Sequence, residues 1–504
     1  MSHPPQSPPR IAIIGSGFAG LGMGIRLKQA GIESFTIYEA ADEIGGTWRD
    51  NTYPGVACDV QSHLYSYSFE PRPEWTRMFA PQAEIFDYLK HCAEKYDLLP
   101  HIRCGTAVTD ARYDESTCGW TVTVGKGEVV QADMVVSATG GLSQPVYPNI
   151  PGIDDFEGNL FHSARWDHDY DLKGKKVGVI GTGASAIQFV PEIAPDVEKL
   201  HLFQRTPPWV LSKPDRAISE RERERFRRRP FWQRLWRRAL YWFLEMRVIV
   251  FVFFPKLMNV VAWEGRRFIR DNVPDPDLRK KLTPDYLPGC KRILMSDVYY
   301  PALTRPNVDV VTKGIQEITP DGIRTADGKE HRLDALIMGT GFQAAEAIPP
   351  FRVAGRDGLL LDEAWRDGAE AYLGTVVSGF PNLFLIVGPN TALGHSSMIF
   401  MIESQIQYIM DCVAARQRVG FLSLEVKKDV QDKYNRMLER RLRRTIWNTG
   451  GCASWYRTAS GKNTTLWPGF TWAFRLRTRK VRLTDFHVVE GTPVRSPAPE
   501  PAPV

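Results

Sequence analysis

The first glycine-rich turn of the chain is surrounded by residue types that bind a dinucleotide. It ends the run "RIAIIG" (10–15) and contains, in the order GxGxxG, Gly15, Gly17, Phe18, Ala19 and Gly20. Such glycines permit a tight turn, close approach of the backbone to a pyrophosphate, and packing of a helix whose N-terminus stabilises negative charge. Glu39 ends the next apolar run, 19 positions after Gly20, where a carboxylate binds both hydroxyls of a ribose. The spacing therefore predicts a site for an adenosine without a 2′-phosphate.

A second turn repeats this arrangement but is followed by the opposite charge. It contains, in the order GxGxxA, Gly181, Thr182, Gly183, Ala184, Ser185 and Ala186. Arg205 follows Gly181 by 24 positions, and Glu39 follows Gly15 by the same 24 positions. A carboxylate at this place would repel a 2′-phosphate, whereas arginine binds one through charge-assisted hydrogen bonds. The second site therefore predicts NADP, and the alternative is an arginine that is merely exposed.

Two unlike dinucleotide sites in one chain imply electron transfer between their cofactors. The pair that fits is NADPH as the donor and FAD as the bound acceptor. The seven cysteines form no CxxC pair, so we expect neither a redox dithiol, a disulfide framework nor a metal site; they are Cys58, Cys92, Cys104, Cys118, Cys290, Cys412 and Cys452. The electrons must then pass to a soluble acceptor or to dioxygen.

The segment between the two turns carries a longer motif. It has the order FxGxxxHxxxW followed by an acid, and its residues are Phe156, Gly158, His162, Trp166 and Asp167. In this motif the chain resembles the class B flavoprotein monooxygenases and, among them, the type I Baeyer–Villiger monooxygenases. The related N- and S-oxygenases usually have Tyr or Phe at the place of Trp166. Because the motif joins the flavin unit to the NADPH unit, we assign His162 and Trp166 to an inter-domain hinge and not to the chemistry.

Two more motifs extend this resemblance over most of the chain, from about residue 10 to 485. "GGTWRDNTYPGVACD" (45–59) matches GGxW…YPGxxxD, and "PGCKR" (288–292) resembles the region of the family's active-site Lys-Arg pair. The resemblance implies flavin contacts at Gly46, Thr47, Trp48, Asp59, Tyr65 and Val108. It implies further cofactor contacts at Arg292 and, around the 2′-phosphate, at Arg205, Thr206 and Lys291. The alternative for Tyr65 is an ordinary core aromatic. We expect His395 to be a packing or hydrogen-bonding histidine and not a catalytic base.

Arg292 and Asp59 are the expected catalytic residues. In the chemistry that the resemblance implies, reduced flavin and dioxygen form a C4a-peroxide, which must stay an anion to attack a ketone and so needs a fixed positive charge. Arginine stays protonated at any working pH, and a nearby carboxylate orients it. The predicted function is an NADPH- and O2-dependent insertion of oxygen beside the carbonyl of a small lipophilic ketone, which gives an ester or lactone. The alternatives are a heteroatom oxygenase that acts on a thioether or amine, and a catalytically silent flavin-binding sensor.

Apolar runs predict the elements that must hold these residues. Five runs rich in Ile and Val precede glycines, at 10–15, 133–140, 175–181, 334–341 and 382–390. Such runs are typical of strands buried on both faces of a parallel sheet. The predicted fold class is α/β, with two Rossmann-like dinucleotide-binding domains, the NADP domain inserted in the FAD domain, and a helical insertion. We expect a disordered tail at 1–9, the FAD domain at 10–145 and 342–490 with the substrate pocket in its second part, the NADP domain at 146–212 and 286–341, the helical insertion at 213–285, and a disordered tail at 491–504.

The helical insertion contains the charge surplus of the whole protein. Residues 220–238 hold nine arginines and three glutamates, a surplus of six that equals the net charge of +6 of the chain. A local patch of this kind indicates a local surface and not a nucleic-acid partner. One interpretation is that the arginines face water while Trp and Phe cover the substrate cavity. The alternative is peripheral contact of 220–254 with an anionic membrane, and in either case we expect a cytoplasmic enzyme without a membrane-spanning helix.

Overall fold

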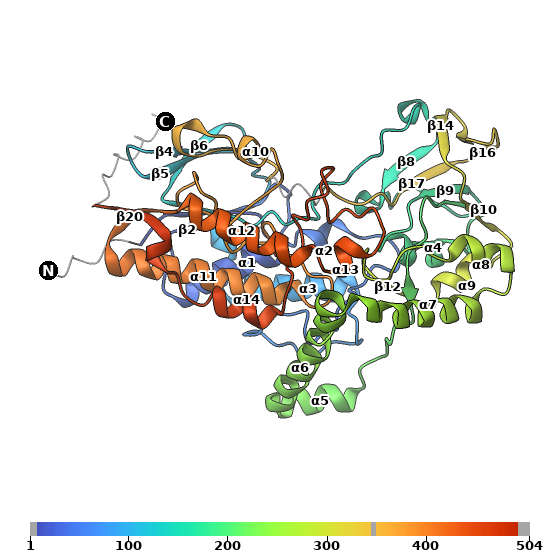
Figure 1. The fold of residues 1–504 in the computed structure, drawn as a ribbon, viewed down its shortest axis with the longest axis horizontal. Helices are drawn as coiled ribbons and strands as arrows, with labels where there is room; N and C mark the ends of the chain where they lie inside the picture. The colour runs from blue at the N-terminus through green and yellow to red at the C-terminus, as the bar shows by residue number, and fades with distance from the viewer. Residues whose placement is uncertain (1–7, 344–348, 492–504) are drawn as a thin grey trace.

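Two parallel sheets form the body of the protein. The computed structural model describes residues 8–343 and 349–491 of the chain, so the tails expected at 1–9 and 491–504 lie outside the described residues except for residues 8, 9 and 491. The first sheet lies at the left of Figure 1 and the second at the right, with the helical insertion below them. The two sheets belong to the two dinucleotide-binding units that the sequence predicts.

The first sheet contains the strand that precedes the first glycine-rich turn. Its order is β19 (Leu383–Leu385), β7 (Met134–Ser137), β1 (Ile11–Ile14), β2 (Phe35–Tyr38) and β3 (Ile102–Arg103). All neighbouring strands in it are parallel. Helix α1 (Phe18–Gln29) leaves the turn and packs against α11 (Met398–Val419). Ile11 and Ile13 of β1 pack on the side of these helices, and Ala12 and Ile14 pack into the apolar cluster on the opposite side, so both faces of β1 are covered, as its unbroken apolar run requires.

The second sheet has the same topology around the second turn. Its order is β13 (Val308–Val311), β10 (Lys199–Phe203), β9 (Lys176–Ile180), β17 (Ala335–Met338) and β8 (Asn159–His162), again all parallel. The strand before the turn, β9, lies between β10 and β17, just as β1 lies between β2 and β7. Helix α4 (Ala186–Ile193) follows the turn. The expected fold class with two Rossmann-like units is confirmed.

The second unit is inserted in the first. Strands β7 and β19 are neighbours in the first sheet, although the whole second sheet lies between them in the chain. Two linkers therefore connect the units, and they run antiparallel, with the amide of Val146 donating to the carbonyl of Gly341 at 2.9 Å and a bridge between Pro145 and Phe342. The exact boundaries that the sequence suggests, such as 145/146 and 341/342, stay a proposal.

Smaller sheets and helices complete both units. The strands are β4 (Val108–Asp114), β5 (Gly119–Val124), β6 (Glu128–Ala132) and β18 (Arg352–Ala354) in one sheet, β14 (Ile315–Thr319), β15 (Gly322–Thr325) and β16 (Glu330–Arg332) in another, and the pairs β11 (Val210–Leu211) with β12 (Leu294–Met295) and β20 (Phe421–Val426) with β21 (Phe486–Glu490). The helices are α2 (Thr47–Asp50), α3 (Gln82–Lys95), α9 (Tyr299–Leu303), α10 (Leu361–Ala364), α12 (Lys428–Leu442), α13 (Ile446–Thr449) and α14 (Thr471–Arg477).

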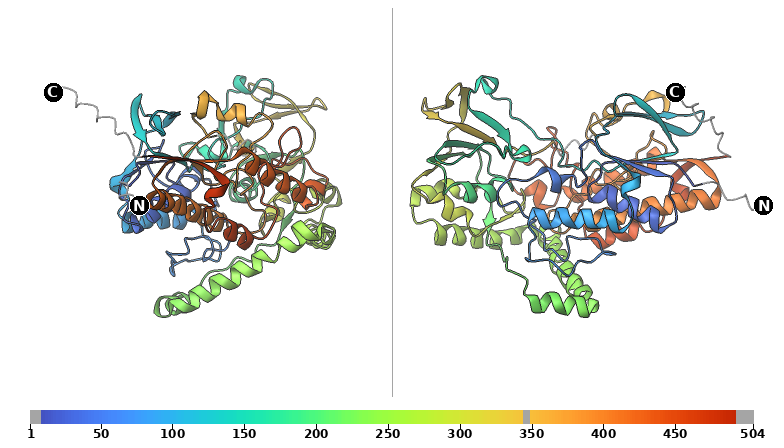
Figure 2. Two further views of the ribbon diagram at one scale, coloured as in Figure 1. Left: turned by 60° about the vertical axis from the view of Figure 1, so that its left-hand side comes forward. Right: turned by 180° about the vertical axis from the view of Figure 1, so that it is seen from behind.

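The helical insertion projects from the body. It consists of α5 (Glu220–Arg228), α6 (Pro230–Glu245), a π-helical turn (Ile249–Phe253), a 3-10 turn (Pro255–Leu257), α7 (Met258–Asn272) and α8 (Pro276–Leu282). Ser219 and Glu222 cap α5 reciprocally, and Pro230 begins α6. Helix α5 and the outer end of α6 extend away from both sheets in every view (Figures 1 and 2). Over the described residues no single helix is long and apolar enough to cross a membrane; the pair 230–253 and 255–272 passes by length and composition, bent by 108°.

One interpretation of this insertion from the sequence is wrong. Most of its large aromatic side chains do not cover a cavity but face outward, as in Phe231, Trp242, Phe243 and Trp263, each more than half exposed. The aromatic side chains of Phe226 and Phe251 are the buried exceptions. The helical pattern predicts the helices, but it does not show which of two apolar stripes faces the body.

The expectation for the cysteines is also wrong at one point. Cys290 and Cys452 form a disulfide, although 162 positions separate them in the chain. It joins the segment after α8 to the loop after α13. Sequence spacing gave no sign of this pair, because only the fold brings the two residues together. The other cysteines are free thiols, namely Cys58, Cys92, Cys104, Cys118 and Cys412.

Thiol counting tests this disulfide. We expect protein unfolded without reductant to expose five thiols, and protein reduced before unfolding to expose all seven, as the cysteine positions require. Absorbance after reaction with a thiol reagent measures both counts. A Cys452→Ser variant should then count six thiols with or without reductant, one fewer than the seven cysteines of the sequence. Seven thiols in the unreduced wild type would contradict the pairing.

Candidate active site

The first glycine-rich turn forms a narrow cradle of backbone. Gly15 has φ of +103°, and a Cβ on Gly20 would lie 1.8 Å from the carbonyl oxygen of Gly15. On the other side, a Cβ on Gly46 would lie 3.2 Å from Cα of Gly17, so the two backbones face each other closely. Side chains are excluded from this place, and the N-terminus of α1 points into it. The residues present therefore fit the pyrophosphate of a dinucleotide.

Glu39 lies at the end of β2 beside this turn and is buried. Its carboxylate accepts hydrogen bonds from the amide and hydroxyl of Ser16 at 2.9 and 2.7 Å and from the amide of Ala41 at 3.1 Å, and it pairs with Arg49 at 3.0 Å. Burial alone would raise the pKa of Glu39, but these hydrogen bonds and the Arg49 charge outweigh it and hold the pKa below its usual value. Glu39 is thus ionised, as recognition of ribose hydroxyls requires, and Arg49 is a member of the site that no motif predicted.

Three of the expected flavin contacts lie together. The indole of Trp48 donates to the hydroxyl of Tyr65 at 3.2 Å, and the Phe18 ring lies 5.3 Å from the Tyr65 ring, edge to face. Thr47 begins the same short helix, α2, as Trp48. Val108 lies apart, at the start of β4, in the apolar cluster that contains Ile14 on the opposite face of the first sheet from α1.

Arg292 and Asp59 form an ion pair at the meeting point of three segments. Nε of Arg292 donates to Oδ2 of Asp59 at 2.6 Å, and Nη1 donates to the carbonyl oxygen of Leu393 at 3.4 Å. About a third of each side chain stays exposed, 33% for Arg292 and 35% for Asp59. The Asp59 charge raises the pKa of Arg292. Burial would raise the pKa of Asp59, but the Arg292 charge and hydrogen bond hold it below its usual value, so both groups are ionised.

Two further cations act on this pair. Lys213, at the beginning of the insertion, and Arg247, just after α6, are close enough for their charges to act on Asp59. Burial lowers the pKa of Arg247, and the positive charge of Arg292 lowers it further. Burial also lowers the pKa of Lys213, against the opposing effect of nearby acids. Sequence analysis missed both residues, because each is a single basic residue outside any motif.

The second site is a cavity with several basic side chains. It has a volume of about 650 Å³ and is lined by Arg205, Thr206, Lys291, Lys280 and Lys281 among others. The hydroxyl of Thr182 in the second turn donates to the carbonyl of Thr206 at 3.2 Å. A Cβ on Gly181 would lie 2.2 Å from the carbonyl oxygen of Gly339, whereas Gly183 faces open space. The donor set fits a phosphorylated dinucleotide, since its basic side chains outnumber the single carboxylate, Asp285, that also lines the cavity.

Neighbouring residues of the PGCKR segment serve different sites. Lys291 lines the basic cavity, with Nζ 5.2 Å from the centre of the Tyr286 ring, whereas Arg292 turns to Asp59. Burial and the charge of Arg205 lower the pKa of Lys291. The disulfide adds to this arrangement, because Cys452 lines the same cavity and Cys290 directly precedes Lys291.

The motif between the turns lies on the second unit and touches both linkers. His162 is fully buried on β8, its Nδ1 accepts from the amide of Ala164 at 3.1 Å, and burial lowers its pKa. Its ring lies 5.6 Å from the ring of Tyr147 and 5.8 Å from that of Phe342, which belong to the two linkers. His162 therefore sits between the only connections that the described residues make between the two units along the chain.

The other motif residues hold this loop in place. A Cβ on Gly158 would lie 2.5 Å from the Phe156 ring and 2.7 Å from the carbonyl oxygen of Asp334, so no larger residue fits. Trp166 packs between Phe161 and Phe189, with ring centres at 5.1 and 5.4 Å. Asp167 accepts from the Asn159 amide at 2.7 Å.

The same loop also contacts the first unit. His168 and Thr52 are joined by a hydrogen bond of 2.7 Å, and Arg165 lies 3.8 Å from the carboxylate of Asp50. The segment of Thr52 packs against α4 as well, because Tyr53 donates to Gln188 at 3.0 Å. The motif thus lies at the junction of the two units.

Comparisons with known proteins agree with this arrangement. A family model for flavin-binding monooxygenase-like proteins matches residues 8–219. A Baeyer-Villiger monooxygenase of Pseudomonas aeruginosa is 55% identical over 480 residues, which are 95% of this chain and 91% of that protein. Another of Streptomyces coelicolor is 49% identical over 487 residues, 96% of this chain and 94% of that protein. The solved structure of OTEMO in complex with FAD and NADP has a TM-score of 0.87 at 29% identity, over 96% of this chain and all of that chain.

Because the pKa of Lys291 is lowered, we predict that the enzyme loses its preference for NADPH over NADH as the pH rises. Lys291 should lose its charge below pH 10.5, which is the usual pKa of lysine. A neutral Lys291 would bind a 2′-phosphate less tightly. We expect the ratio of kcat/KM for NADPH to that for NADH to fall as the pH rises toward this value. In this ratio, the titration of groups that affect kcat/KM equally for both cofactors cancels.

A substitution isolates the group that titrates. Lys291→Arg keeps the charge at all working pH values, so its ratio should stay flat over the same range. Lys329→Arg, on an exposed turn, is the matched control and should behave as wild type. Identical profiles for wild type and Lys291→Arg would remove Lys291 from the 2′-phosphate site.

Proposed function

The chain belongs to the Baeyer–Villiger monooxygenases, within the flavin-binding monooxygenase-like family, and we propose that it inserts an oxygen atom of O2 beside the carbonyl of a ketone, with NADPH as reductant, to give an ester or lactone. The observation that carries this proposal is the ionised Arg292–Asp59 pair at the meeting point of the loop after α2, the segment after α8 and the C-terminal segment. A catalytically silent flavin sensor would not need a fixed, partly exposed cation at this place.

FAD and NADP fit the two sites through different residues. The proposed flavin contacts are Gly15, Gly17, Phe18, Ala19, Gly20, Glu39, Gly46, Thr47, Trp48, Asp59, Tyr65 and Val108. The proposed NADP contacts are Gly181, Thr182, Gly183, Ala184, Ser185, Ala186, Arg205, Thr206 and Lys291, with Arg292 beside both cofactors. When bound, FAD accepts hydride from NADPH and supplies the activated oxygen that is transferred.

Arg292 is proposed to stabilise negative charge on oxygen during the transfer. Its guanidinium is permanently charged, and because a third of the side chain is exposed, it can reach a ligand while it stays bound to Asp59. Asp59 orients the guanidinium through Nε, which leaves terminal N–H groups to face the reacting oxygen. Preorganised charge of this kind needs no rearrangement when the transition state forms.

The motif residues Phe156, Gly158, His162, Trp166 and Asp167 are proposed to control the relative position of the two units. This is supported by the contacts of His162 with both linkers and by the bond from Thr52 to His168. A junction of this kind would let the two units adopt more than one relative position during a reaction that uses both cofactors.

Substrate and location are proposals of the same kind. We propose a small lipophilic ketone as substrate, with a thioether as the second candidate, since the same activated oxygen serves both. We also propose that the enzyme is cytoplasmic and that residues 220–254 contact a membrane surface, which the outward aromatic side chains of the insertion support.

Replacement of Arg292 tests the proposed chemistry. Arg292→Ala should still allow anaerobic NADPH to bleach the yellow flavin, because hydride transfer does not depend on this charge. With a methyl ketone in air, ester yield per NADPH should fall by at least about a hundredfold, in keeping with loss of one preorganised charge donor. Hydrogen peroxide should replace the ester.

A control variant and a measurement on the wild type accompany this experiment. Arg332→Ala removes an exposed arginine of β16 and should keep the wild-type ester yield. Wild-type flavin that does not bleach with NADPH would contradict the oxygenase function itself. Unchanged ester yield in Arg292→Ala would contradict only the role of Arg292.

Replacement of His162 tests the proposed hinge. His162→Ala removes the ring between Tyr147 and Phe342, so we expect slower flavin reduction and more hydrogen peroxide per NADPH, with the flavin content unchanged. Stopped-flow absorbance and peroxide assays measure the two effects. The nearby exposed His168 side chain offers a comparison, since His168→Ala removes only the single bond to Thr52 and should have the smaller effect. Loss of FAD from His162→Ala would refute the hinge.

A further inference from the structure

Helix α6 has two stripes of side chains on opposite sides. The inner stripe packs against the protein, and the outer stripe is apolar and exposed. The inner stripe has a spacing of three and four residues and consists of Gln233, Arg237, Leu240, Tyr241, Leu244 and Glu245. The outer stripe has the same spacing and consists of Phe231, Trp232, Leu235, Trp236, Trp242, Phe243 and Met246, which are 37 to 64% exposed. The protein covers the inner stripe, whereas the apolar outer stripe has no partner among the described residues.

The inner stripe fixes α6 firmly to the body. Arg237 donates to the carbonyls of His63 and Ser66 at 2.7 and 2.9 Å, and Gln233 donates to the carbonyl of Arg72 at 2.7 Å. At the inner end, the buried carboxylate of Glu245 accepts from the hydroxyl of Thr471 at 2.8 Å. These buried polar contacts set the rotation of the helix. The outer stripe is therefore held toward solvent and is not a face that could turn inward.

The exposed apolar surface continues through the bend into α7. Phe253, Phe254, Leu257, Val260 and Trp263 are 48 to 64% exposed. With the outer stripe of α6 they form what we call the aromatic ridge, which contains twelve of the large hydrophobic side chains that are exposed over the described residues. Exposed apolar surface on this scale is typical of a contact surface and not of a solvated helix.

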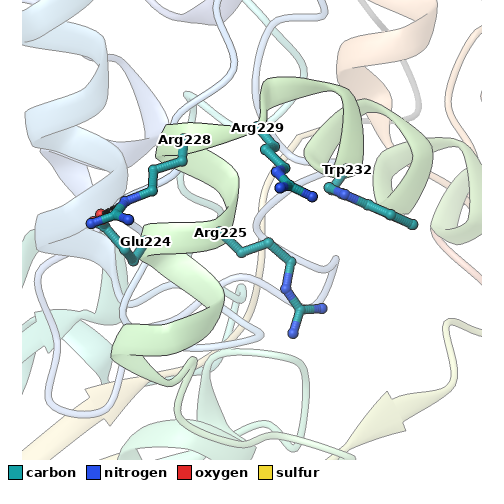
Figure 3. Close-up of a pocket in the computed structure, with 5 residues that line it drawn as sticks. All are labelled: Glu224, Arg225, Arg228, Arg229 and Trp232. Atoms are coloured by element: carbon teal, nitrogen blue, oxygen red, sulfur yellow. Dashed lines mark hydrogen bonds and ion pairs between the residues drawn. The ribbon is translucent and has the colours of Figure 1, made fainter.

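Arginines without acidic partners border the ridge. Among the described residues, Arg225, Arg229, Arg234 and Arg238 form no ion pair, in contrast to Arg227 and Arg228, which pair with Glu224. Figure 3 shows a hollow at the elbow of α5 and α6, with Glu224 and Arg228 together on one side and the side chains of Arg225, Arg229 and Trp232 on the other. Its volume is about 340 Å³. Two free guanidinium groups beside an indole are suited to a phosphate that lies at the edge of an apolar phase.

We infer that the aromatic ridge docks on an anionic phospholipid bilayer, with Arg225 and Arg229 bound to lipid phosphates, and that the ketone enters the enzyme from that bilayer. Aromatic side chains among arginines are the composition of helices that lie in the interface of such membranes. A second copy of the chain is the less suitable occupant, because a symmetric contact would bring the same unpaired arginines against each other. The entry of the ketone rests on the proposed function.

The bend connects the ridge to the active site over a few residues. Phe251 points inward and packs with Trp447 and Tyr456, whereas Phe253 and Phe254 point outward. Arg247, at the start of the bend, is close enough to Arg292 for its pKa to be lowered by that charge. The bend thus has its inner side near the proposed catalytic cation and its outer side on the ridge.

Vesicle flotation with the holoenzyme tests docking. We expect the wild type to float with vesicles of phosphatidylcholine containing about 30% phosphatidylglycerol at about 0.1 M salt, and to stay in solution with pure phosphatidylcholine or at about 0.5 M salt. The combined variant Arg225→Gln, Arg229→Gln and Arg234→Gln should partition at least tenfold less. The combined variant Trp232→Ser, Phe243→Ser and Trp263→Ser should lose binding by a similar factor, because it removes the apolar contact.

Matched control variants distinguish loss of docking from a general effect of changed net charge or surface polarity. Arg305→Gln, Arg366→Gln and Arg436→Gln change the same charge at exposed positions elsewhere. Leu99→Ser, Val129→Ser and Val489→Ser remove exposed apolar side chains elsewhere. Both control proteins should float as the wild type does.

Two outcomes of the flotation experiment overturn the proposal: wild type that stays in solution with anionic vesicles, or an equal loss of vesicle binding in the ridge variants and the control variants. A concentration-dependent dimer that the ridge substitutions abolish, without vesicle binding, would assign the ridge to a second copy and overturn it as well.

Assays with two ketones distinguish a failure of this inference from a failure of the proposed function. With a short, water-soluble methyl ketone, the ridge variants should keep the wild-type kcat/KM within about twofold, since no ridge residue belongs to the catalytic machinery. With a long-chain methyl ketone held in anionic vesicles, their rate should fall in parallel with their binding. Equal rates of wild type and ridge variants on the vesicle-held ketone would refute entry from the bilayer. Wild type that floats but oxidises neither ketone would leave docking intact and refute the proposed function.

Discussion

The ion pair between Arg292 and Asp59 is the interaction on which the arrangement of the site depends. It joins the loop after α2 to the segment after α8, and the same guanidinium reaches the carbonyl of Leu393 in the C-terminal part. A partly buried charge that loses its partner is strongly destabilised, so each of these segments constrains the other two. The cation proposed to stabilise the reacting oxygen is therefore also the cation that holds three distant parts of the chain together.

The inserted arrangement of the two units adds a second constraint. Because β7 and β19 are neighbours in the first sheet, the second unit must leave and re-enter the first one at nearly the same place. The linkers consequently run side by side, and His162 contacts an aromatic residue on each of them. A junction with two adjacent, antiparallel connections restricts the second unit to movement about them, in keeping with the proposed hinge. The disulfide between Cys290 and Cys452 restrains the wall of the second cavity.

The helical insertion connects the surface of the protein with this centre. Its inner side contributes Arg237 and Glu245 to buried hydrogen bonds, and its bend brings Arg247 close to Arg292. Its outer side is apolar and bordered by arginines. One element thus places Arg247 near the proposed catalytic cation and carries the surface proposed to dock on a membrane, and the charge surplus of the chain is concentrated in this element.

The sequence by itself determined the two dinucleotide units, their cofactor types and the family, because glycine turns, strand ends and charged residues at fixed spacing depend on local backbone geometry. It also placed Arg292 and Asp59 on the list of site residues, but only through a motif resemblance. Tertiary structure alone decided which residues meet: Arg49 with Glu39, Lys213 and Arg247 with the ion pair, and Cys290 with Cys452. It also decided that the aromatic residues of α6 face outward. Contacts between segments far apart in the chain leave no periodic pattern, and a helix with two apolar stripes does not reveal which one is buried until its partners are in place.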